Sequence, residues 1–268
     1  DISISKYGIR SGMTAKITDA VTATVSLNTD YGKSYRNSLK GSNTETEDQM
    51  IRAVYLTPGW VPLLVKGLPN NWAQSPNPPG AWNPIGLFNS GQYEKSNNQG
   101  ITLNASLEYK PAFLKGLTAR VQYGKINRSG TSKQYFPSYT VYNFARKGQN
   151  SLLYSDSLIS TSNISNTNRL QEGTSYSNSY QLIGSLTYAK TFRKHDFDIL
   201  VAAEQTEAEG NSYLTYRDGQ QIPGVDQMFA FNAATTTVQL NGATESGKRS
   251  YLTRLNYNYD GKYLVEFI

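Results

Sequence analysis

Residues 7–17 read Tyr-Gly-Ile-Arg-Ser-Gly-Met-Thr-Ala-Lys-Ile, and this stretch decides the fold class. Its odd positions are mostly apolar, and its even positions are polar or glycine. Side chains of a β-strand alternate between two faces, so this pattern predicts a strand with one apolar and one polar face. After a short turn at residues 18–20 the alternation resumes over residues 21–28, which predicts an antiparallel hairpin.

The same unit recurs three more times along the chain. The further predicted strand pairs cover residues 101–110 and 117–124, residues 176–188 and 197–203, and residues 251–259 and 263–267. This makes about eight strands, each near the roughly 9 to 11 residues that cross a bilayer at a tilt.

The connections between these strands alternate between short turns and long segments. The long segments run over about residues 30–100, 127–175 and 205–249. Long structureless loops are uncommon in compact domains. They are typical of outer-membrane barrels, which have short periplasmic turns and long extracellular loops.

Composition agrees with strands that cross a membrane. Hydrophobic residues make up 38% of the chain, and mean hydropathy is −0.53. No stretch approaches the roughly 18 apolar residues that a spanning helix needs, which excludes a helical membrane bundle. A barrel needs apolar residues only at alternate positions. The 20 tyrosines, many at the ends of predicted strands, predict aromatic girdles at the membrane interfaces.

Charge and cysteine content narrow the function classes. The net charge is +6, but the basic residues are scattered singly, so no nucleic-acid partner is expected. The absence of cysteine excludes disulfides, thiolate metal sites and cysteine nucleophiles.

One short helix is expected in the first long loop. Thr44 is a suitable N-cap, and Glu47 completes a capping box three positions later. The helix is expected to end near Leu56, before Pro58. Residues 68–88, rich in Pro, Asn and Gly, are predicted as coil with turns.

Several stretches resemble one protein family. Residues 251–264 read Tyr-Leu-Thr-Arg-Leu-Asn-Tyr-Asn-Tyr-Asp-Gly-Lys-Tyr-Leu, residues 109–117 carry Tyr-Lys-Pro and Leu-Lys-Gly-Leu, and residues 7–31 form the early hairpin. Together with Asn83-Pro84 in the first long loop, their order is similar to that of SusC/RagA-type TonB-linked outer-membrane transporters of Bacteroidetes.

The resemblance implies an all-β fold, namely an antiparallel transmembrane β-barrel segment with long extracellular loops. Such transporters are barrels of roughly 22 strands with a plugged lumen. Residues 1–268 are therefore expected to be a partial outer-membrane β-barrel domain, without the plug domain, the TonB box and the remaining strands.

The resemblance also implies a function. The intact protein is expected in the bacterial outer membrane, embedded in lipid bilayer and lipopolysaccharide. It is expected to import oligosaccharides or peptides with energy from TonB and with a SusD-like surface lipoprotein as partner. Two alternatives stay open, namely a complete small eight-stranded barrel with a structural or adhesion role, and a soluble all-β glycan-binding module.

Enzyme chemistry is not predicted, and no cofactor or metal is expected. Residues 242–249 approach a phosphate-binding loop, but Arg249 stands where Ser or Thr is needed and a strand follows in place of a helix. His195, the only histidine, is interpreted as part of a solvated turn. Three nearby carboxylates are interpreted as a solvated rim: Glu204, Glu207 and Glu209.

The first long loop holds the candidate ligand contacts. Aromatic faces stack on sugar rings and amides hydrogen-bond hydroxyls, so this combination suits a glycan. The alternative is that the same residues pack the loop or dock a partner lipoprotein. The candidates are Trp60, Trp72, Trp82, Asn70, Asn71 and Asn83.

A second group of candidates faces the lumen by strand parity. These polar side chains are predicted either to line a solute path or contact a plug, or to form a solvated, mutually paired wall. They are Arg10, Lys16, Glu108, Arg120, Gln122, Arg254 and Glu266.

Overall fold

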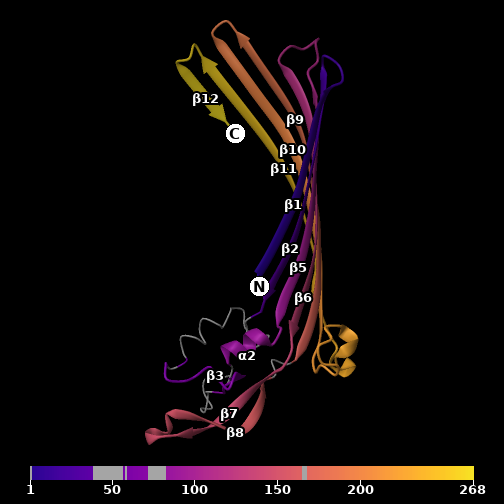
Figure 1. Ribbon diagram of the computed structural model, residues 1–268. Coiled ribbons are helices and arrows are strands. Elements are labelled where there is room, and N and C mark those ends of the chain that lie inside the picture. The colour runs from indigo at the N-terminus through magenta and orange to yellow at the C-terminus, as the bar shows by residue number, and fades with distance from the viewer. Residues whose placement is uncertain (1, 39–56, 58, 72–82, 165–167) are drawn as a thin grey trace.

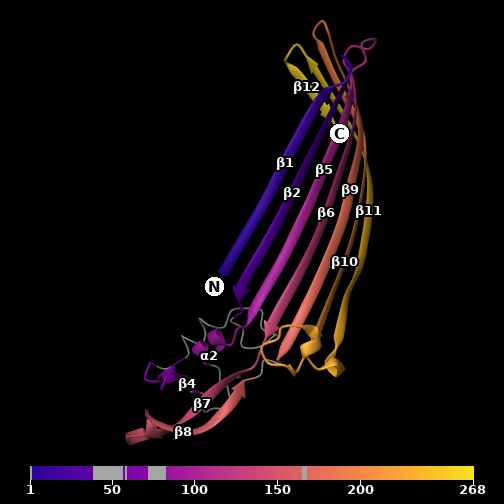
Figure 2. The same cartoon turned by 45° about the vertical axis from the view of Figure 1, so that its right-hand side comes forward.

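A single large antiparallel sheet dominates the structure. The computed structural model describes residues 2–38, 57, 59–71, 83–164 and 168–268. The sheet has eight strands in the order β1-β2-β5-β6-β9-β10-β11-β12, all of them long except β12, and Figures 1 and 2 show them side by side. The all-β class and the eight strands of the sheet are confirmed. The strands are β1 (Ile2–Lys16), β2 (Val21–Asn37), β5 (Tyr93–Tyr109), β6 (Leu117–Phe136), β9 (Arg169–Phe192), β10 (His195–Arg217), β11 (Thr237–Tyr259) and β12 (Tyr263–Phe267).

The sheet is an open, curved wall. Its two edges are β1 and β12. A closed eight-stranded barrel would pair these two strands, and no such pairing occurs among the described strands.

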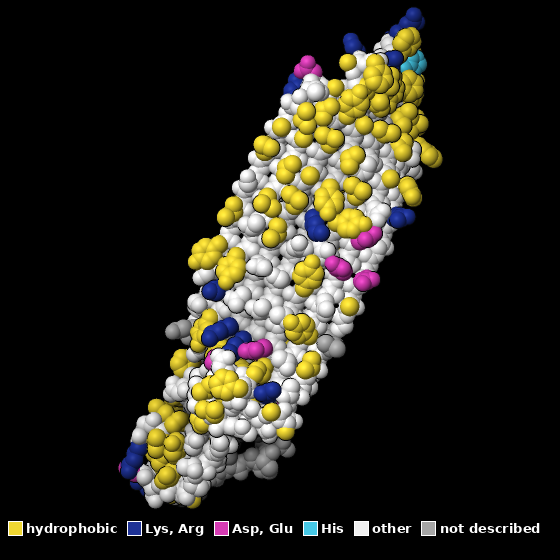
Figure 3. Space-filling model, turned by 90° about the vertical axis from the view of Figure 1, so that its right-hand side faces the viewer, with side chains coloured by type: hydrophobic (Ala, Val, Ile, Leu, Met, Phe, Trp, Pro, Cys, Tyr) yellow, Lys and Arg dark blue, Asp and Glu magenta, His cyan; other side chains and the backbone are white. Residues whose placement is uncertain are grey.

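Register keeps most of the apolar side chains on one face of the sheet. Val25 lies opposite Met13 on one side and Ala105 on the other. Leu107 lies opposite Val121, and Val201 lies opposite Leu186. We call this the outer face; it is turned to the right in Figure 1 and toward the viewer in Figure 3, where apolar side chains gather toward the short-turn end.

The apolar part of the outer face forms a band beside the short turns. On β10 the outer positions are apolar from Phe197 to Ala203 and polar from Gln205 to Glu209. On β11 they change at Arg249, which lies directly opposite Gln205. On these two strands the change occurs in the same row of paired residues, whereas on β5 the apolar outer positions continue two rows further, to Ile101.

The strands are longer than the roughly 9 to 11 residues predicted. β9 has 24 residues and β10 has 23. At about 3.3 Å per residue β9 is about 80 Å long, well beyond a hydrocarbon layer of about 30 Å. The prediction was wrong because both faces are polar beyond the apolar band, so hydropathy no longer alternates although backbone pairing continues.

Smaller elements lie at the long-loop end of the sheet. The predicted coil over residues 68–88 is wrong in part, because it contains a short helix. The predicted helix over residues 44–56 lies outside the described residues. The small elements are β3 (Leu64–Val65), β4 (Leu68–Pro69), α2 (Pro84–Asn89), β7 (Tyr139–Lys147), η1 (Gln149–Ser151), β8 (Leu153–Ile164), η2 (Met228–Ala230) and η3 (Ala233–Thr235).

The connection between β10 and β11 folds back onto the outer face. We call residues 218–236 the outer loop; it is seen at the right in Figure 1. Its Ala230 and Phe231 are buried against Tyr93, Tyr135 and Leu170, which come from three neighbouring strands. The Phe231 ring meets the Tyr135 ring edge-on, with 6.4 Å between ring centroids. A hydrophobic core therefore fixes this loop far from the apolar band.

Replacing Phe231 with Ala is expected to detach the outer loop. Deleting a buried phenylalanine side chain costs about 3–5 kcal/mol. Hydrogen exchange over residues 218–236 should accelerate strongly, while exchange in β9 and β10 near their short turn stays slow. Phe229→Ala is the matched control, because Phe229 in the same loop is 70% exposed. Equal exchange in both variants would show that the aromatic core does not hold the loop.

Candidate functional site

The polar face of the sheet, which we call the inner face, is the first candidate site. The register places all seven predicted lumen-facing residues on it. Glu108 lies opposite Arg120, and Glu266 lies opposite Asn256. The inner face of β2 and β5 carries mainly hydroxyl and amide groups, and a furrow there has among its lining residues Thr24, Ser26, Asn104, Ser106, Gln122 and Gln181.

Two of these charges have ionic partners beside the short turns. Lys16 Nζ lies 3.4 Å from Asp19 Oδ1, and Glu108 Oε1 lies 2.7 Å from Lys110 Nζ. Both pairs lie beside short turns, so the choice between a solute path and a mutually paired wall stays a prediction. The distribution of donors and acceptors along the inner face suits a hydrated surface that polar solutes can contact.

Strand parity missed an apolar interruption of the inner face. Ile183, Leu200 and Leu252 lie at inner positions of β9, β10 and β11. Leu200 is directly opposite Arg254, so apolar and charged groups alternate there. The even positions of β10 do contain this signal in the sequence, as Leu200 and Ala202 between Asp198 and Glu204.

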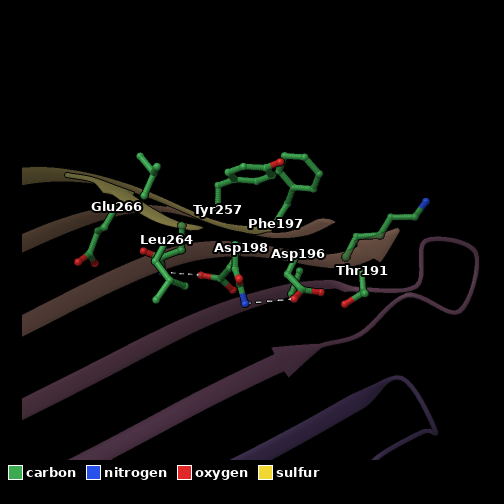
Figure 4. Close-up of a pocket in the computed structure, with 12 residues that line it drawn as sticks. Thr191, Asp196, Phe197, Asp198, Tyr257, Leu264 and Glu266 are labelled. Atoms are coloured by element: carbon green, nitrogen blue, oxygen red, sulfur yellow. Dashed lines mark hydrogen bonds between the residues drawn. The ribbon is translucent and has the colours of Figure 1, made fainter. Parts of the chain in front are cut away.

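Acidic groups gather on the inner face beside the last short turns. Figure 4 shows Asp196, Asp198 and Glu266 on one side of the sheet, with Phe197 and Tyr257 on the other. The Asn258 Nδ2 donates to Asp196 at 3.4 Å, and the Asn256 Nδ2 donates to Asp198 at 3.5 Å. Among the residues with defined positions, no group of His, Cys, Asp or Glu is arranged to hold a metal ion.

His195 lies in an aromatic cluster, where the sequence predicted a solvated turn. It begins β10 and lies among rings on the outer face. Its Nδ1 is 2.7 Å from the Tyr257 hydroxyl oxygen, and its ring centroid is 4.9 Å from that of Tyr259. Phe197 and Tyr263 extend the cluster. This cluster agrees with the aromatic girdle expected at the short-turn end.

The second candidate site is the set of loops beyond the sheet, where Asn83 has a structural role. Its Oδ1 accepts hydrogen bonds from Ile85 and Gly86, which caps α2. Its Nδ2 donates to the carbonyl oxygens of Leu63 and Asn70, at 2.6 and 2.9 Å. Because Asn70 and Asn83 are fully buried, a solute cannot reach them in this conformation. In this structure these two residues pack the loop, which is the alternative to ligand contact given above.

The other predicted loop contacts have different surroundings. Trp60 is half exposed, and the Arg146 guanidinium lies 5.9 Å from its ring centroid. The backbone N–H of Asn71 donates to the carbonyl oxygen of Tyr142 at 2.8 Å. Trp72 and Trp82 lie outside the described residues. Ligand contact by these four residues stays a prediction.

Ionic and polar contacts add to the aromatic core that holds the outer loop. The Arg169 guanidinium binds both carboxylate oxygens of Asp218, at 2.7 and 2.9 Å. Tyr93 donates its hydroxyl to Asp226, and Lys133 Nζ lies 3.5 Å from the same carboxylate. Partial burial opposes ionisation of Asp226, but the bond from Tyr93 and the charge of Lys133 outweigh it and lower its pKa.

Burial affects the ionisation of tyrosines at the same end of the sheet. Desolvation, then the hydrogen bond to Asp226, raises the pKa of Tyr93. Desolvation alone raises the pKa of Tyr139, which packs with Leu87 and Val141 under the short helix. Both phenols therefore stay neutral and act as donors or packing groups, with no role as bases.

Comparison with known proteins identifies the class of fold. The chain is similar to the solved RagAB peptide transporter, with a TM-score of 0.66 and 15% identity over 98% of this chain and 27% of that chain. It matches the RagAB peptide importer in the open-open state (TM-score 0.65, 16% identity, 96% and 26% covered) and in the closed-closed state (0.66, 16%, 98% and 27%).

These likenesses show a shared fold. The chain spans about a quarter of the length of these transporter chains. No family model and no curated protein matches the sequence. No helix within the described ranges is long and apolar enough to cross a membrane.

The outer loop is expected to loosen in acid. Because the pKa of Asp226 is lowered on folding, its stabilisation is complete above the ordinary value of 3.8 and is lost as the pH falls through the lower, folded-state pKa. Hydrogen exchange over residues 218–236, corrected for intrinsic rates, should therefore be faster at about pH 3 than at about pH 6. Asp226→Asn should reduce this difference. An unchanged pH response in that variant would rule out the carboxylate as its source.

Proposed function

We propose that this chain forms part of the wall of an outer-membrane nutrient importer. The observation that carries the proposal is the division of one sheet into an apolar outer band and a polar inner face. Hydrocarbon requires apolar side chains outside and fully paired backbone groups within the sheet. The fold likeness to RagAB importers supports the same reading.

The proposed cargo is an oligosaccharide or a peptide, and the proposed mechanism is binding and passage without bond chemistry. The solved neighbours are named as peptide transporters. A SusD-like surface lipoprotein is the proposed partner at the long-loop end, and TonB is the proposed source of energy through parts of the protein beyond this chain. Bilayer lipid and lipopolysaccharide are proposed to surround the outer face.

The two alternative functions have less support. A complete eight-stranded barrel needs pairing between β1 and β12, which the described strands do not make. A soluble glycan-binding module would expose large apolar side chains to water across several neighbouring strands, an arrangement that favours aggregation. Leu107, Val121 and Leu186 are each about half exposed.

Charge placed on the outer face should lower the stability of the protein in a membrane. Val121→Arg puts a guanidinium in the apolar band, at an expected cost of about 2–4 kcal/mol in a bilayer. Gln122→Arg, one residue further along the same strand, points to the inner face and should be tolerated. The measurement is the urea midpoint of the intact protein in lipid vesicles. Equal midpoints for the two variants would contradict a lipid-facing outer surface.

Loss of the intact gene should remove uptake of one nutrient class. The deletion strain should grow poorly on either peptides or oligosaccharides as sole carbon source, while growth on glucose stays normal. The tagged intact protein should also purify with a surface lipoprotein. Normal growth on both nutrient classes, with no lipoprotein recovered, would argue against an importer.

A further inference from the structure

The β7–β8 hairpin has an unusual position in the molecule. Figures 1 and 2 show it extending past the long-loop end of the sheet. The two strands pair only with each other as a sheet, from Tyr139 opposite Ile164 to Lys147 opposite Leu153. One edge of the hairpin is therefore formed by β7 and the other by β8.

The β7 edge already has a neighbour. The backbone N–H of Asn71 donates to the Tyr142 carbonyl oxygen at 2.8 Å, and Asn70 forms a parallel bridge with the same residue. Within the described part of the chain no strand pairs with the other side of β8. The six β8 residues 156–161 are all exposed, as expected of an open edge.

Register shows which backbone groups of β8 point to the open side. The Tyr142 carbonyl points toward Asn71 and so away from β8. Directly opposed residues of an antiparallel pair either exchange both hydrogen bonds or exchange none. Tyr142 is opposite Thr161, so the N–H and C=O of Thr161 point to the open edge. Asn163, two residues along, presents its groups in the same direction.

The open edge is held in strand geometry by its own hairpin. The Asn143 amide donates to the hydroxyl oxygens of Ser160 and Ser162, at 2.9 and 3.1 Å. Regular pairing covers residues 160–164; the irregularity at Ile159 lies just outside it, and a second one falls between Leu158 and Tyr154. An edge that is already ordered loses little conformational entropy when it binds.

Residues that usually protect an open edge are missing from β8. Native edge strands commonly carry Lys or Pro, which block pairing with another chain. Residues 153–164 contain no Lys, Arg or Pro. The single charge, Asp156, lies 4.0 Å from Lys66 and is at the far side of the irregularity. Leu158 and Ile159 are exposed beside the regular segment and offer apolar contact.

We infer that the β8 edge captures an extended peptide by strand addition. Its donors and acceptors repeat every second residue, about 6.8 Å apart, which matches the backbone of another strand. Sugar hydroxyls have no such repeat. Because the side chains around Thr161 and Asn163 are neutral, binding should depend on the backbone of the peptide and not on its charge. This inference rests on the proposed import function and deepens it by choosing peptides as the cargo.

The test uses the intact protein in detergent and a tryptic digest of casein as the probe. Bound peptides are identified by mass spectrometry, and one of about ten residues is then titrated. Thr161→Pro removes the N–H on the open side and leaves the pairing with β7 intact. We expect at least tenfold weaker peptide binding by Thr161→Pro. Thr161→Ala, which keeps the N–H, should bind as the unmodified protein does.

A second measurement does not depend on folding of the proline variant. The same peptide, N-methylated at every residue, cannot donate to the edge and should bind the unmodified protein at least tenfold more weakly. Normal binding of this peptide, or of the original peptide by Thr161→Pro, would overturn the inference. Binding of dextran oligosaccharides but not of peptides would also overturn it. A Thr161→Pro variant that still binds the peptide but no longer binds the lipoprotein would do the same. Membrane insertion and the Val121→Arg result are independent of these outcomes.

Discussion

Continuous backbone pairing is the constraint on which the rest of the structure depends. Because each strand is in antiparallel register with the next, side-chain parity set in β1 is still valid in β12, and a slip of one residue would exchange the two faces. The turns contribute to this register. Gly116 has a φ of +99°, and a Cβ there would lie 2.1 Å from the Ala189 carbonyl oxygen, so this turn requires glycine.

The sequence predicts the sheet well where its two faces meet different surroundings. Residues 101–109 alternate sharply because Leu103 and Leu107 lie in the apolar band and Asn104 and Glu108 do not. Beyond that band the contrast disappears, and the added strand length was missed. The short helix was missed for another reason. Asn83-Pro84 is a cap followed by a favoured first residue, but six residues are too few to show helical periodicity.

The position of a candidate residue could be predicted when it depends only on its own strand, and not when it depends on contacts with distant parts of the chain. Strand parity placed Arg10 and Arg120 on the inner face from sequence alone. The role of Asn83 depends on carbonyl groups of Leu63 and Asn70, which come from separate parts of the chain. His195 illustrates the same limit, because its neighbours Tyr257 and Tyr259 come from β11, about sixty residues away in the sequence.

The attachment of the outer loop restricts how the opening of such a wall can be controlled. Residues 218–236 are bound to the outer face by Phe231 and by the Arg169–Asp218 pair. A segment anchored there cannot also swing across the opposite side of the wall. The long-loop end of β9 and β10 is therefore fixed in position on its outer side. In the proposed importer, a segment that closes over the inner face therefore has to come from a part of the protein other than the outer loop.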